Sequence, residues 1–339
     1  MAAADMTKPA LLVTGGAGYI GSHVCKAVAA AGFLPVTYDN LCSGHPWAVR
    51  WGPLETGELA DGARLDAVMR KYRPAAVIHL AGLIAVGESV TDPALYYANN
   101  VSGSISLLDA MRRNGVDRIV FSSTAAVYGE PEEAMPMPES HPQRPLNPYG
   151  TSKLMIERVL QDYARAYGLR SVSLRYFNAA GADPDTEIGE AHPVETHLIP
   201  LILDVAAGRR HHIAIYGDDY ATHDGTCLRD YIHVADLADA HVLALKYLDN
   251  SVGAHAFNLG NGAGTTVKEV IETVRRVTGA PIPVRVEARR PGDPAVLLAD
   301  SDRARRILVW QPRHSAVETM VASAWAWHQR VPTGRQVVV

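Results

Sequence analysis

The stretch Ala10-Leu-Leu-Val-Thr-Gly-Gly-Ala-Gly-Tyr-Ile-Gly21 decides the fold. Its first five residues form a short apolar run that is typical of a buried parallel strand, and residues 22–31 have the pattern of a helix. Gly15 allows a tight turn off the strand, Gly18 leaves room for a pyrophosphate, and Gly21 lets the helix pack closely against the strand. The N-terminus of that helix offers free N–H groups and a positive dipole end to phosphates. The stretch therefore predicts a dinucleotide-binding site.

A second apolar run, residues 33–38, predicts the next strand, and Asp39 stands at its end. A carboxylate at this place can bind the ribose hydroxyls of the adenosine and would repel a 2′-phosphate, which favours NAD over NADP. The alternative interpretation is an ordinary turn aspartate ahead of Asn40.

The alternation of strand and helix patterns continues through the first half of the chain. Strands are predicted over 75–82, 118–123 and 170–178, and helices over 61–72 and 93–114. Such an alternation predicts an α/β fold of the Rossmann type, a doubly wound parallel sheet with ligands at the carboxyl ends of its strands. Ala81 and Gly82 lie at such an end, whereas His79 lies inside an apolar run and is interpreted as a core residue.

Composition excludes several classes of function. The chain has 339 residues, of which 47% are hydrophobic, and a net charge of −4, so no basic face for nucleic acid or anionic membrane is expected. No apolar run reaches membrane-spanning length, and the N-terminus lacks a signal-peptide pattern. The three cysteines are too few and too scattered for a disulfide framework or a zinc site. A reducing cytoplasm is the simplest location.

Tyr149 and Lys153 are the candidate catalytic pair. They stand four residues apart at the start of a helical pattern that follows Asn147-Pro148. Residues i and i+4 share one face of a helix, so the phenol and the ammonium lie side by side. A neighbouring cation favours the phenolate and brings a tyrosine, whose ordinary pKa is about 10, toward the range of a general base. A chance pair at this spacing is the alternative.

The second half of the chain has a looser pattern. Helices are predicted over 198–207, from 229 to about 248, over 267–279 and up to about 329, with strands over 212–217, 257–260 and 282–286. The predicted dinucleotide-binding domain covers residues 1–177, with 232–260 returning to it. A smaller mixed α/β lobe, residues 178–231 and 261–330, binds the substrate, and 331–339 form a tail.

Charged and metal-ligating side chains are frequent in this second lobe. Arg289 and Arg290 at a predicted turn, together with Arg229, are suited to clamp a diphosphate, although ordinary surface arginines are the alternative. Histidines and acids without the spacing of a known ligand set give no basis for predicting a metal site. They include His192, His197, His211, His212 and Asp183.

Several motifs occur together and in order. They are Gly15-x-x-Gly18-x-x-Gly21, Ser122-Ser-Thr124, Tyr149-x-x-x-Lys153 and Arg175-Tyr-Phe-Asn178. With this set the chain resembles the extended short-chain dehydrogenase/reductase family, and within it the UDP-glucose 4-epimerases. The narrower signals include Gly15-Gly-Ala-Gly-Tyr-Ile-Gly-Ser-His23, Tyr38-Asp-Asn-Leu41, Arg229-Asp-Tyr-Ile-His-Val234 and Arg290-x-Gly-Asp293. The resemblance covers almost the whole chain, from about residue 11 to about residue 327.

The resemblance implies a mechanism. Tyr149 takes a proton from the sugar 4-hydroxyl while C4 gives hydride to NAD⁺, and Thr124 hydrogen-bonds both the 4-oxygen and Tyr149. Lys153, together with the positive nicotinamide, lowers the Tyr149 pKa and holds the ribose. The 4-keto sugar then rotates about its link to the diphosphate, hydride returns to the other face, and NAD remains bound.

The resemblance also implies two sets of binding residues and a homodimer. The NAD set comprises Gly15, Gly18, Tyr19, Ile20, Gly21, Asp39, Asn40, Glu58, Leu59, Ala81, Gly82, Asn99, Ser122, Tyr149, Lys153 and Tyr176. The UDP-sugar set comprises Thr124, Tyr149, Asn178, His197, Leu198, Ala214, Tyr216, Arg229, Arg290, Asp293 and Leu297. The dimer pairs the helices at 93–114 and 148–168 with those of a second subunit.

Some positions depart from the best-known pattern of this family. Ile84 stands where a lysine is usual, His197 where an asparagine is usual, and Leu297 where a tyrosine or cysteine is usual; Glu58 replaces an aspartate near the adenine. The first three positions line the sugar, so UDP-pentose or UDP-N-acetylhexosamine substrates are alternatives to UDP-glucose and UDP-galactose.

Other activities on the same scaffold are less well supported. A dehydratase or decarboxylase would have an acidic residue after Thr124, where this chain has Ala125 and Ala126. A net dehydrogenase would exchange its cofactor with solvent. A non-catalytic nucleotide-binding protein would tolerate loss of Tyr149 or Lys153, and both residues are present.

Overall fold

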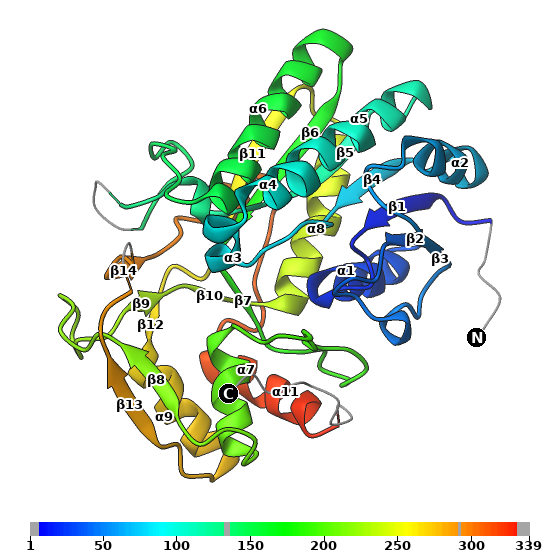
Figure 1. Ribbon diagram of the computed structural model, residues 1–339. Helices are drawn as coiled ribbons and strands as arrows, with labels where there is room; N and C mark the ends of the chain where they lie inside the picture. The colour runs from blue at the N-terminus through cyan, green and yellow to red at the C-terminus, as the bar shows by residue number, and fades with distance from the viewer. Residues whose placement is uncertain (1–6, 132–135, 291–292, 331–339) are drawn as a thin grey trace.

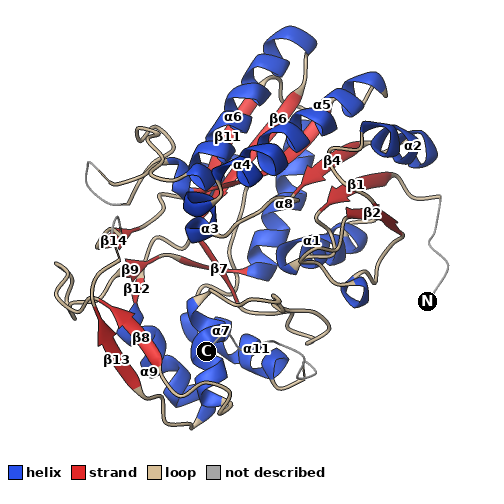
Figure 2. Cartoon of the chain, viewed as in Figure 1, coloured by secondary structure: helices blue, strands red, loops and turns tan. Residues whose placement is uncertain are grey.

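The computed structural model describes residues 7–131, 136–290 and 293–330. Its centre is a seven-stranded sheet in the order β11-β6-β5-β4-β1-β2-β3, in which every neighbouring pair is parallel (Figures 1 and 2). The strands span Ala10–Thr14 (β1), Leu34–Asp39 (β2), Leu54–Thr56 (β3), Ala76–His79 (β4), Arg118–Thr124 (β5), Arg170–Tyr176 (β6) and Ala254–Leu259 (β11). The predicted Rossmann-type α/β fold is confirmed.

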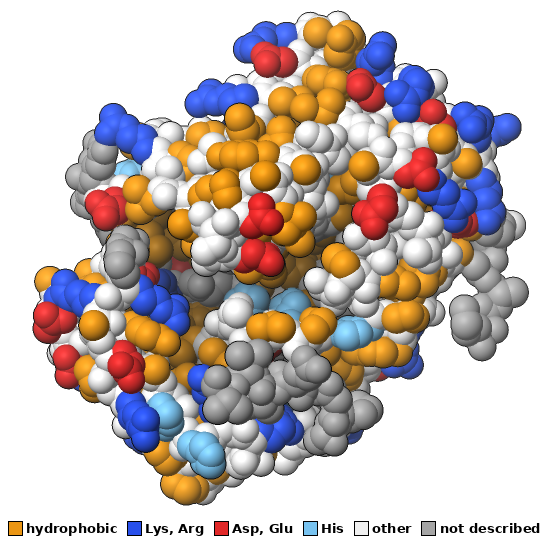
Figure 3. Space-filling view, viewed as in Figure 1, with side chains coloured by type: hydrophobic (Ala, Val, Ile, Leu, Met, Phe, Trp, Pro, Cys, Tyr) orange, Lys and Arg blue, Asp and Glu red, His pale blue; other side chains and the backbone are white. Residues whose placement is uncertain are grey.

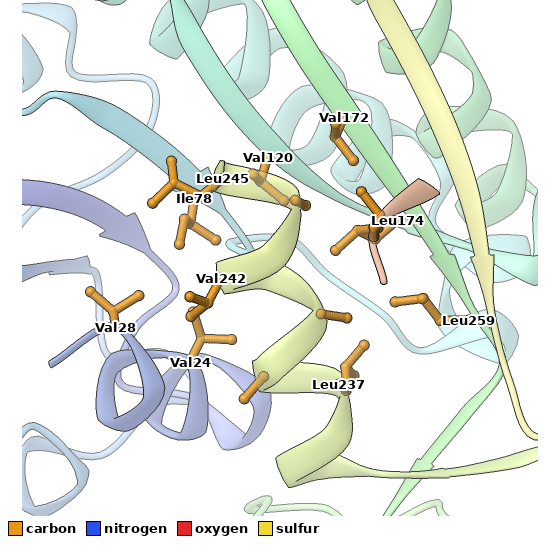
Figure 4. Close-up of a cluster of buried hydrophobic side chains, with 14 of the residues drawn as sticks. Val24, Val28, Ile78, Val120, Val172, Leu174, Leu237, Val242, Leu245 and Leu259 are labelled. Atoms are coloured by element: carbon orange, nitrogen blue, oxygen red, sulfur yellow. The ribbon is translucent and has the colours of Figure 1, made fainter. Parts of the chain in front are cut away.

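Helices cover both faces of this sheet. One face carries α1 (Tyr19–Ala30) and α8 (Val234–Leu248), which lie side by side, and the other carries α2 (Gly62–Tyr72), α5 (Gly103–Arg113) and α6 (Pro148–Tyr167). The core on the α1–α8 side consists mainly of aliphatic side chains from both helices and the sheet, together with Tyr176, Phe257 and Trp310. Figure 4 labels Val24, Val28, Ile78, Val120, Val172, Leu174, Leu237, Val242, Leu245 and Leu259 there. This packing fixes the carboxyl ends of the strands, where ligands bind in such folds.

A smaller group of elements lies beside the carboxyl ends of the central strands. It contains short strands, namely β7 (Asn178–Ala180), β8 (Ile213–Tyr216), β9 (Leu228–Arg229), β10 (Tyr231–His233), β12 (Thr265–Thr266), β13 (Val284–Glu287) and β14 (Val296–Leu297). Its helices are α7 (Leu198–Ala206), α9 (Val267–Thr278) and α11 (Val317–His328), which share a hydrophobic core. The surface is hollowed between this group and the central sheet (Figure 3).

The division into two lobes at the stated residues stays a prediction. The return of residues 232–260 agrees with the position of α8 and β11. However, α10 (Asp302–Ile307) packs on β11, and Trp310 is buried in the core of the central sheet although it was assigned to the second lobe. The tail at 331–339 lies outside the described residues.

The structure corrects two predicted helices. Residues 229–233, predicted as the start of a helix, form parts of strands β9 and β10, and the helix begins only at Val234, capped by the His233 side chain. The single helix predicted over 93–114 consists of α4 (Pro93–Tyr96), a π-helical stretch (Tyr97–Ser102) and α5. A preceding short helix, α3 (Val86–Thr91), was not predicted. Among the described residues, none of the helices is both long and apolar enough to cross a membrane.

Candidate active site

The glycine loop between β1 and α1 is shaped by close backbone contacts. Gly15 has a φ of +73°, and its N–H donates to the Tyr38 carbonyl at 2.9 Å. A Cβ on Gly15 would lie 2.6 Å from the Ala81 nitrogen, and a Cβ on Gly21 would lie 2.0 Å from the Gly15 oxygen. These two glycines are therefore required by packing, and the atoms nearest to a Cβ at Gly21 belong to the turn that follows β1.

Gly18 differs from these two glycines because a Cβ there would meet only the Gly15 oxygen, at 3.4 Å. Gly18 is the N-cap of α1, and no side chain caps that terminus or places an acid in its first turn. The N–H groups at the start of this helix, including those of Tyr19 and Ile20, are thus available to an anion. An uncapped helix end behind an open glycine fits the pyrophosphate of NAD.

Asp39 at the end of β2 is held beside this loop. Its carboxylate accepts hydrogen bonds from the Ala17 N–H at 3.0 Å and the Leu41 N–H at 2.8 Å. Burial raises the pKa of Asp39, and these two backbone hydrogen bonds act in the opposite direction. Next to it, the Asn40 amide donates to the Glu58 carboxylate at 3.1 Å. The structure brings these three predicted residues together, as binding of an adenosine requires.

Tyr149 lies in the first turn of α6, opposite the end of β5. The Asn147 side chain caps the helix by accepting from the Gly150 N–H at 2.9 Å, and Pro148 occupies its first turn. The Tyr149 side chain lies close to that of Thr124. Burial raises the pKa of Tyr149, and the Thr124 hydrogen bond lowers it.

Lys153 is buried one turn further along α6. Its ammonium donates to the Ser122 carbonyl at 2.9 Å and lies 5.0 Å from the centroid of the Phe121 ring. Burial lowers the pKa of Lys153 from 10.5 to about 8. The ammonium is thus directed to the strand backbone, and the lowering of the Tyr149 pKa by Lys153 stays a prediction.

Other residues predicted on the nicotinamide side come from the ends of neighbouring strands and from the π-helical stretch. A Cβ on Gly82 would lie 3.4 Å from the Lys153 nitrogen. The hydroxyls of Ser122 and Tyr176 form a short hydrogen bond. Asn99 lies on the π-helical stretch, where its amide donates to the side-chain Oδ1 of Asn100 at 3.4 Å.

Two structural supports of the site were missed by sequence reasoning. The Asn100 amide bonds both the N–H and the carbonyl of Leu83 and donates to Ser152 at 3.1 Å, so it ties the loop after β4 to α6. Behind Thr124, the buried Arg175 and Glu157 form an ion pair that joins β6 to α6. Arg175 was predicted only as part of a motif, and the pattern of neither helix nor strand indicates such partners.

Three of the predicted UDP-sugar residues, Asn178, His197 and Leu198, line one cavity in the smaller group of elements. Its lining also includes Glu190, Tyr231 and Trp327. Asn178 is oriented by donation from its amide to the Asp230 carbonyl at 2.9 Å. His197 is the N-cap residue of α7, so Leu198 begins that helix.

The cationic residues of the predicted diphosphate clamp are already paired in the structure. β9 and β14 are parallel neighbours, which sets Leu297 beside Arg229, and the Arg229 guanidinium forms a short ion pair with Asp293. The Arg290 guanidinium stacks 3.8 Å from the centroid of the Tyr216 ring, near Ala214 on the same strand β8. Residues 291–292 of the Arg290-x-Gly-Asp293 motif lie outside the described residues.

Leu297 packs near the end of β5. It packs on a small cluster formed by Val127, Tyr128 and Met137, next to Phe177. Ile84, in contrast, is 46% exposed. Of the departures from the family pattern, Leu297 is therefore the one that the packing fixes most firmly.

The fold and the site define a class of protein. A model of the NAD-dependent epimerase/dehydratase family matches residues 11–260, and the chain belongs to that family. Its cofactor is NAD. Among the relatives, the UDP-glucose 4-epimerase of Rhizobium meliloti (strain 1021) is 52% identical over 94% of this chain and 97% of its own length.

Two solved structures are also similar over nearly their full length. The UDP-glucose 4-epimerase of Brucella ovis in complex with NAD has a TM-score of 0.92 and 52% identity, covering 94% of this chain and 98% of the other. The UDP-glucose 4-epimerase of Stenotrophomonas maltophila, solved with NAD and formylated UDP-arabinopyranose, has a TM-score of 0.91 and 41% identity, covering 95% and 98%.

Proposed function

We propose that this chain is an NAD-dependent UDP-glucose 4-epimerase that interconverts UDP-glucose and UDP-galactose through a transient 4-keto sugar. The observation that carries the proposal is the placement of Tyr149 close to Thr124, at the carboxyl end of β5, with Lys153 buried one helical turn away. A tyrosine in this position can act as base and acid on one oxygen, and the relatives support that chemistry.

The residues that would hold the cofactor are those of the glycine loop, Asp39 with Asn40 and Glu58, and the group around Ser122, Tyr176 and Lys153. The α1 N-terminus binds the pyrophosphate, and Asp39 binds the adenosine ribose. When bound, NAD⁺ accepts hydride from C4, returns it, and adds a positive charge that favours the Tyr149 phenolate.

Proton movement belongs to the chain's own residues. Tyr149 removes the proton of the sugar 4-hydroxyl and later returns it to the 4-oxygen from the same side of the site. Thr124 supplies the hydrogen bond that stabilises the phenolate and the 4-oxygen. Lys153, fixed on the Ser122 carbonyl, holds the nicotinamide ribose and keeps a cation behind Tyr149. Because burial alone raises the pKa of Tyr149, these cationic and hydrogen-bonding neighbours decide whether it works as a base.

The smaller group of elements would bind UDP while the sugar turns. Arg229 and Arg290 are the cations for the diphosphate, with Asn178, Leu198 and His197 around the cavity beside them. For Arg229, binding means exchanging or sharing its present partner Asp293, which would then be free to accept from the uridine ribose. The Tyr216 ring, already stacked on a guanidinium, and Ala214 offer a flat surface for uracil.

The residues around Leu297 determine which sugar the site accepts. Leu297 limits the space beside Phe177, which favours UDP-hexoses and admits UDP-pentoses, whereas a bulky N-acetyl group would press on the cluster under Leu297. The second candidate, a UDP-pentose 4-epimerase, is supported by the pentose nucleotide in the Stenotrophomonas maltophila structure.

Assembly and location complete the proposal. A homodimer through α4, α5 and α6 is supported by exposed apolar side chains there: Leu95 is 43% exposed, Met155 45% and Tyr167 58%. Figure 3 shows hydrophobic side chains gathered over these helices.

The reducing cytoplasm suits a chain whose Cys25, Cys42 and Cys227 are all unpaired.

The test is a parallel assay of the purified chain with UDP-galactose, UDP-N-acetylgalactosamine and UDP-arabinose, with no NAD added. We expect the highest kcat/KM with UDP-galactose and turnover without added cofactor. A requirement for added NAD, with net accumulation of NADH, would indicate a dehydrogenase. Absence of turnover with all three nucleotides, from protein shown to contain NAD, would contradict the proposal.

A further inference from the structure

The segment that connects β7 to α7 contains a cluster of four side chains that the proposed mechanism does not use as a unit. One donor atom each from Glu190, His192, Glu195 and His197 lies within 4.8 Å of all the others. These residues belong to a run Glu-x-His-x-x-Glu-x-His, which does not have the spacing of a known ligand set. The structure folds the run back on itself so that its four functional groups meet.

The distances between these donors are close to those of a coordination shell. Glu190 Oε1 lies 3.1 Å from His192 Nδ1 and 2.7 Å from His197 Nδ1. Glu195 lies 3.7 Å from His192 Nδ1 through Oε2 and 3.1 Å from His197 Nδ1 through Oε1. A tetrahedral ion with bonds of about 2.0–2.2 Å holds its ligand atoms about 3.3–3.6 Å apart. The observed separations bracket that value.

A second observation points to a ligand in the cluster. The Glu195 side chain is only 5% exposed, yet its Oε2 has no hydrogen-bond partner, and neither has His192 Nδ1. Glu195 Oε1, in contrast, accepts the N–H groups of Thr196 at 2.8 Å and His197 at 2.9 Å. A buried carboxylate oxygen without a donor is costly. Two such atoms directed into one cluster are satisfied together by a bound cation.

We propose that Glu190, His192, Glu195 and His197 bind one divalent transition-metal ion of the Zn²⁺ class. Two imidazole nitrogens and two carboxylate oxygens suit such an ion, and the two carboxylates balance its charge. The competing arrangement, two imidazolium ions paired with two carboxylates, has the same net charge but leaves the Glu195 oxygen without a hydrogen bond.

A nearby acidic cluster serves as an internal comparison. Asp183, Asp185 and Glu187 also converge, but their charge is met by Lys26, which lies 2.8–2.9 Å from all three. That cluster already has its cation in the chain. Of the two clusters, the His–Glu cluster is the one with a buried carboxylate oxygen, Glu195 Oε2, that has no hydrogen-bond donor.

The position of the cluster indicates a structural role for the ion. The His192 ring packs edge-on against Tyr19 of the glycine loop, with ring centroids 6.4 Å apart, and the Tyr19 hydroxyl donates to the Gly181 carbonyl at 2.6 Å. On the other side, Trp327 Nε1 donates to the Glu190 carbonyl at 3.0 Å, and His197 is the N-cap of α7. An ion here would fix the connection between the proposed NAD and UDP sites.

The first experiment measures metal directly. The full chain, expressed in zinc-supplemented medium and desalted, should contain about one Zn²⁺ per chain by mass spectrometry of the elements. After chelation, Co²⁺ should restore one equivalent with the intense visible absorption of a four-coordinate site, and Tm should fall on chelation and recover. A chain that takes up neither Zn²⁺ nor Co²⁺ would overturn the proposal, whatever its epimerase activity.

The second experiment assigns the ligands. His192→Ala and Glu195→Gln should each weaken Zn²⁺ binding by at least about 100-fold, since even outer-shell changes cost 10–100-fold. His223→Ala is the matched control, because His223 also faces a glutamate, Glu269 at 3.2 Å, but on the exposed surface. If His192→Ala does not fold, Zn²⁺ binding by Glu195→Gln tests the assignment, because this variant keeps the shape of the side chain. Binding equal to that of the parent chain in the variants that fold would overturn the assignment.

Discussion

Thr124, the last residue of β5, lies close to Tyr149, in the first turn of α6, and its hydroxyl lowers the pKa of the Tyr149 phenol against the effect of burial. The strand end and the helix start are set independently, the first by pairing of β5 with β4 and β6, the second by the Asn147 cap. The phenol is therefore held by two rigid elements, and this allows its pKa to be controlled by its neighbours.

Replacing Tyr149 by phenylalanine removes the hydroxyl and keeps the ring. We expect kcat for UDP-galactose to fall by at least about 10³-fold, because general acid–base catalysis contributes about 10²–10⁴-fold and both half-reactions need it. NAD content, measured from cofactor released by denaturation, should be unchanged. Turnover close to that of the parent chain would rule out Tyr149 as the base.

Replacing Thr124 by valine removes the hydrogen bond that lowers the pKa of Tyr149. The Tyr149 pKa should then rise, and the acidic limb of the kcat/KM profile should move to higher pH by about 1–2 units, since a hydrogen bond to a charged group contributes about 1.5–3 kcal/mol. Activity at pH 7 should fall more than activity at pH 9. A uniform loss at all pH values would indicate a purely structural role for Thr124.

The parts of the site that depend on local pattern were predictable. Each of three features depends on a short stretch of sequence: the glycine loop, Asp39 at the end of its strand, and the Tyr149–Lys153 pair. Periodicity and turn chemistry are enough to locate such stretches. Contacts between distant residues were not. The pairing of β7 with β10, the Arg229–Asp293 ion pair and the Arg175–Glu157 ion pair join segments whose approach only the assembled fold decides.

Lys153 should destabilise the protein at neutral pH. Burial lowers its pKa from 10.5 to about 8, so between these values the unfolded chain binds more protons than the folded chain. Stability contributed through this group therefore rises as pH increases from about 8 to 10.5, and the cost is fully present below pH 8. The difference corresponds to about 3 kcal/mol.

Lys153→Met should accordingly be inactive but more stable than the parent chain at pH 7, by about 1–3 kcal/mol in urea unfolding. The advantage should shrink at pH 10, where the lysine of the parent chain is neutral when folded. Both proteins are measured without NAD, whose loss from the variant would otherwise obscure the comparison. A variant less stable than the parent chain at pH 7 would contradict this account of Lys153.

Alanine substitutions at two glycines of the NAD loop should have different effects, one on NAD binding and the other on the stability of the fold. A Cβ at Gly18 has 3.4 Å of clearance, so Gly18→Ala should change the free energy of unfolding by under about 1 kcal/mol while reducing NAD retention. A Cβ at Gly21 would lie 2.0 Å from the Gly15 oxygen, so Gly21→Ala should cost about 1–3 kcal/mol or more. Urea unfolding and NAD content of both variants test this. Equal loss of stability in both variants would contradict the space available for a Cβ at Gly18.

Removing one partner of the Arg175–Glu157 ion pair should strongly destabilise the fold, whereas replacing both partners by apolar residues should destabilise it much less. Both side chains are at most 4% exposed, and Glu157 also accepts from Ser123, next to Thr124. Arg175→Met alone leaves a buried carboxylate without its cation and should cost about 3–5 kcal/mol, whereas the double variant with Glu157→Leu should recover much of that loss. The control is Arg165→Met in the exposed Arg165–Asp162 pair, which should cost under about 1 kcal/mol. Additive losses in the double variant would mean that the two side chains stabilise the fold separately, and that α6 with its Tyr149 does not depend on this pair.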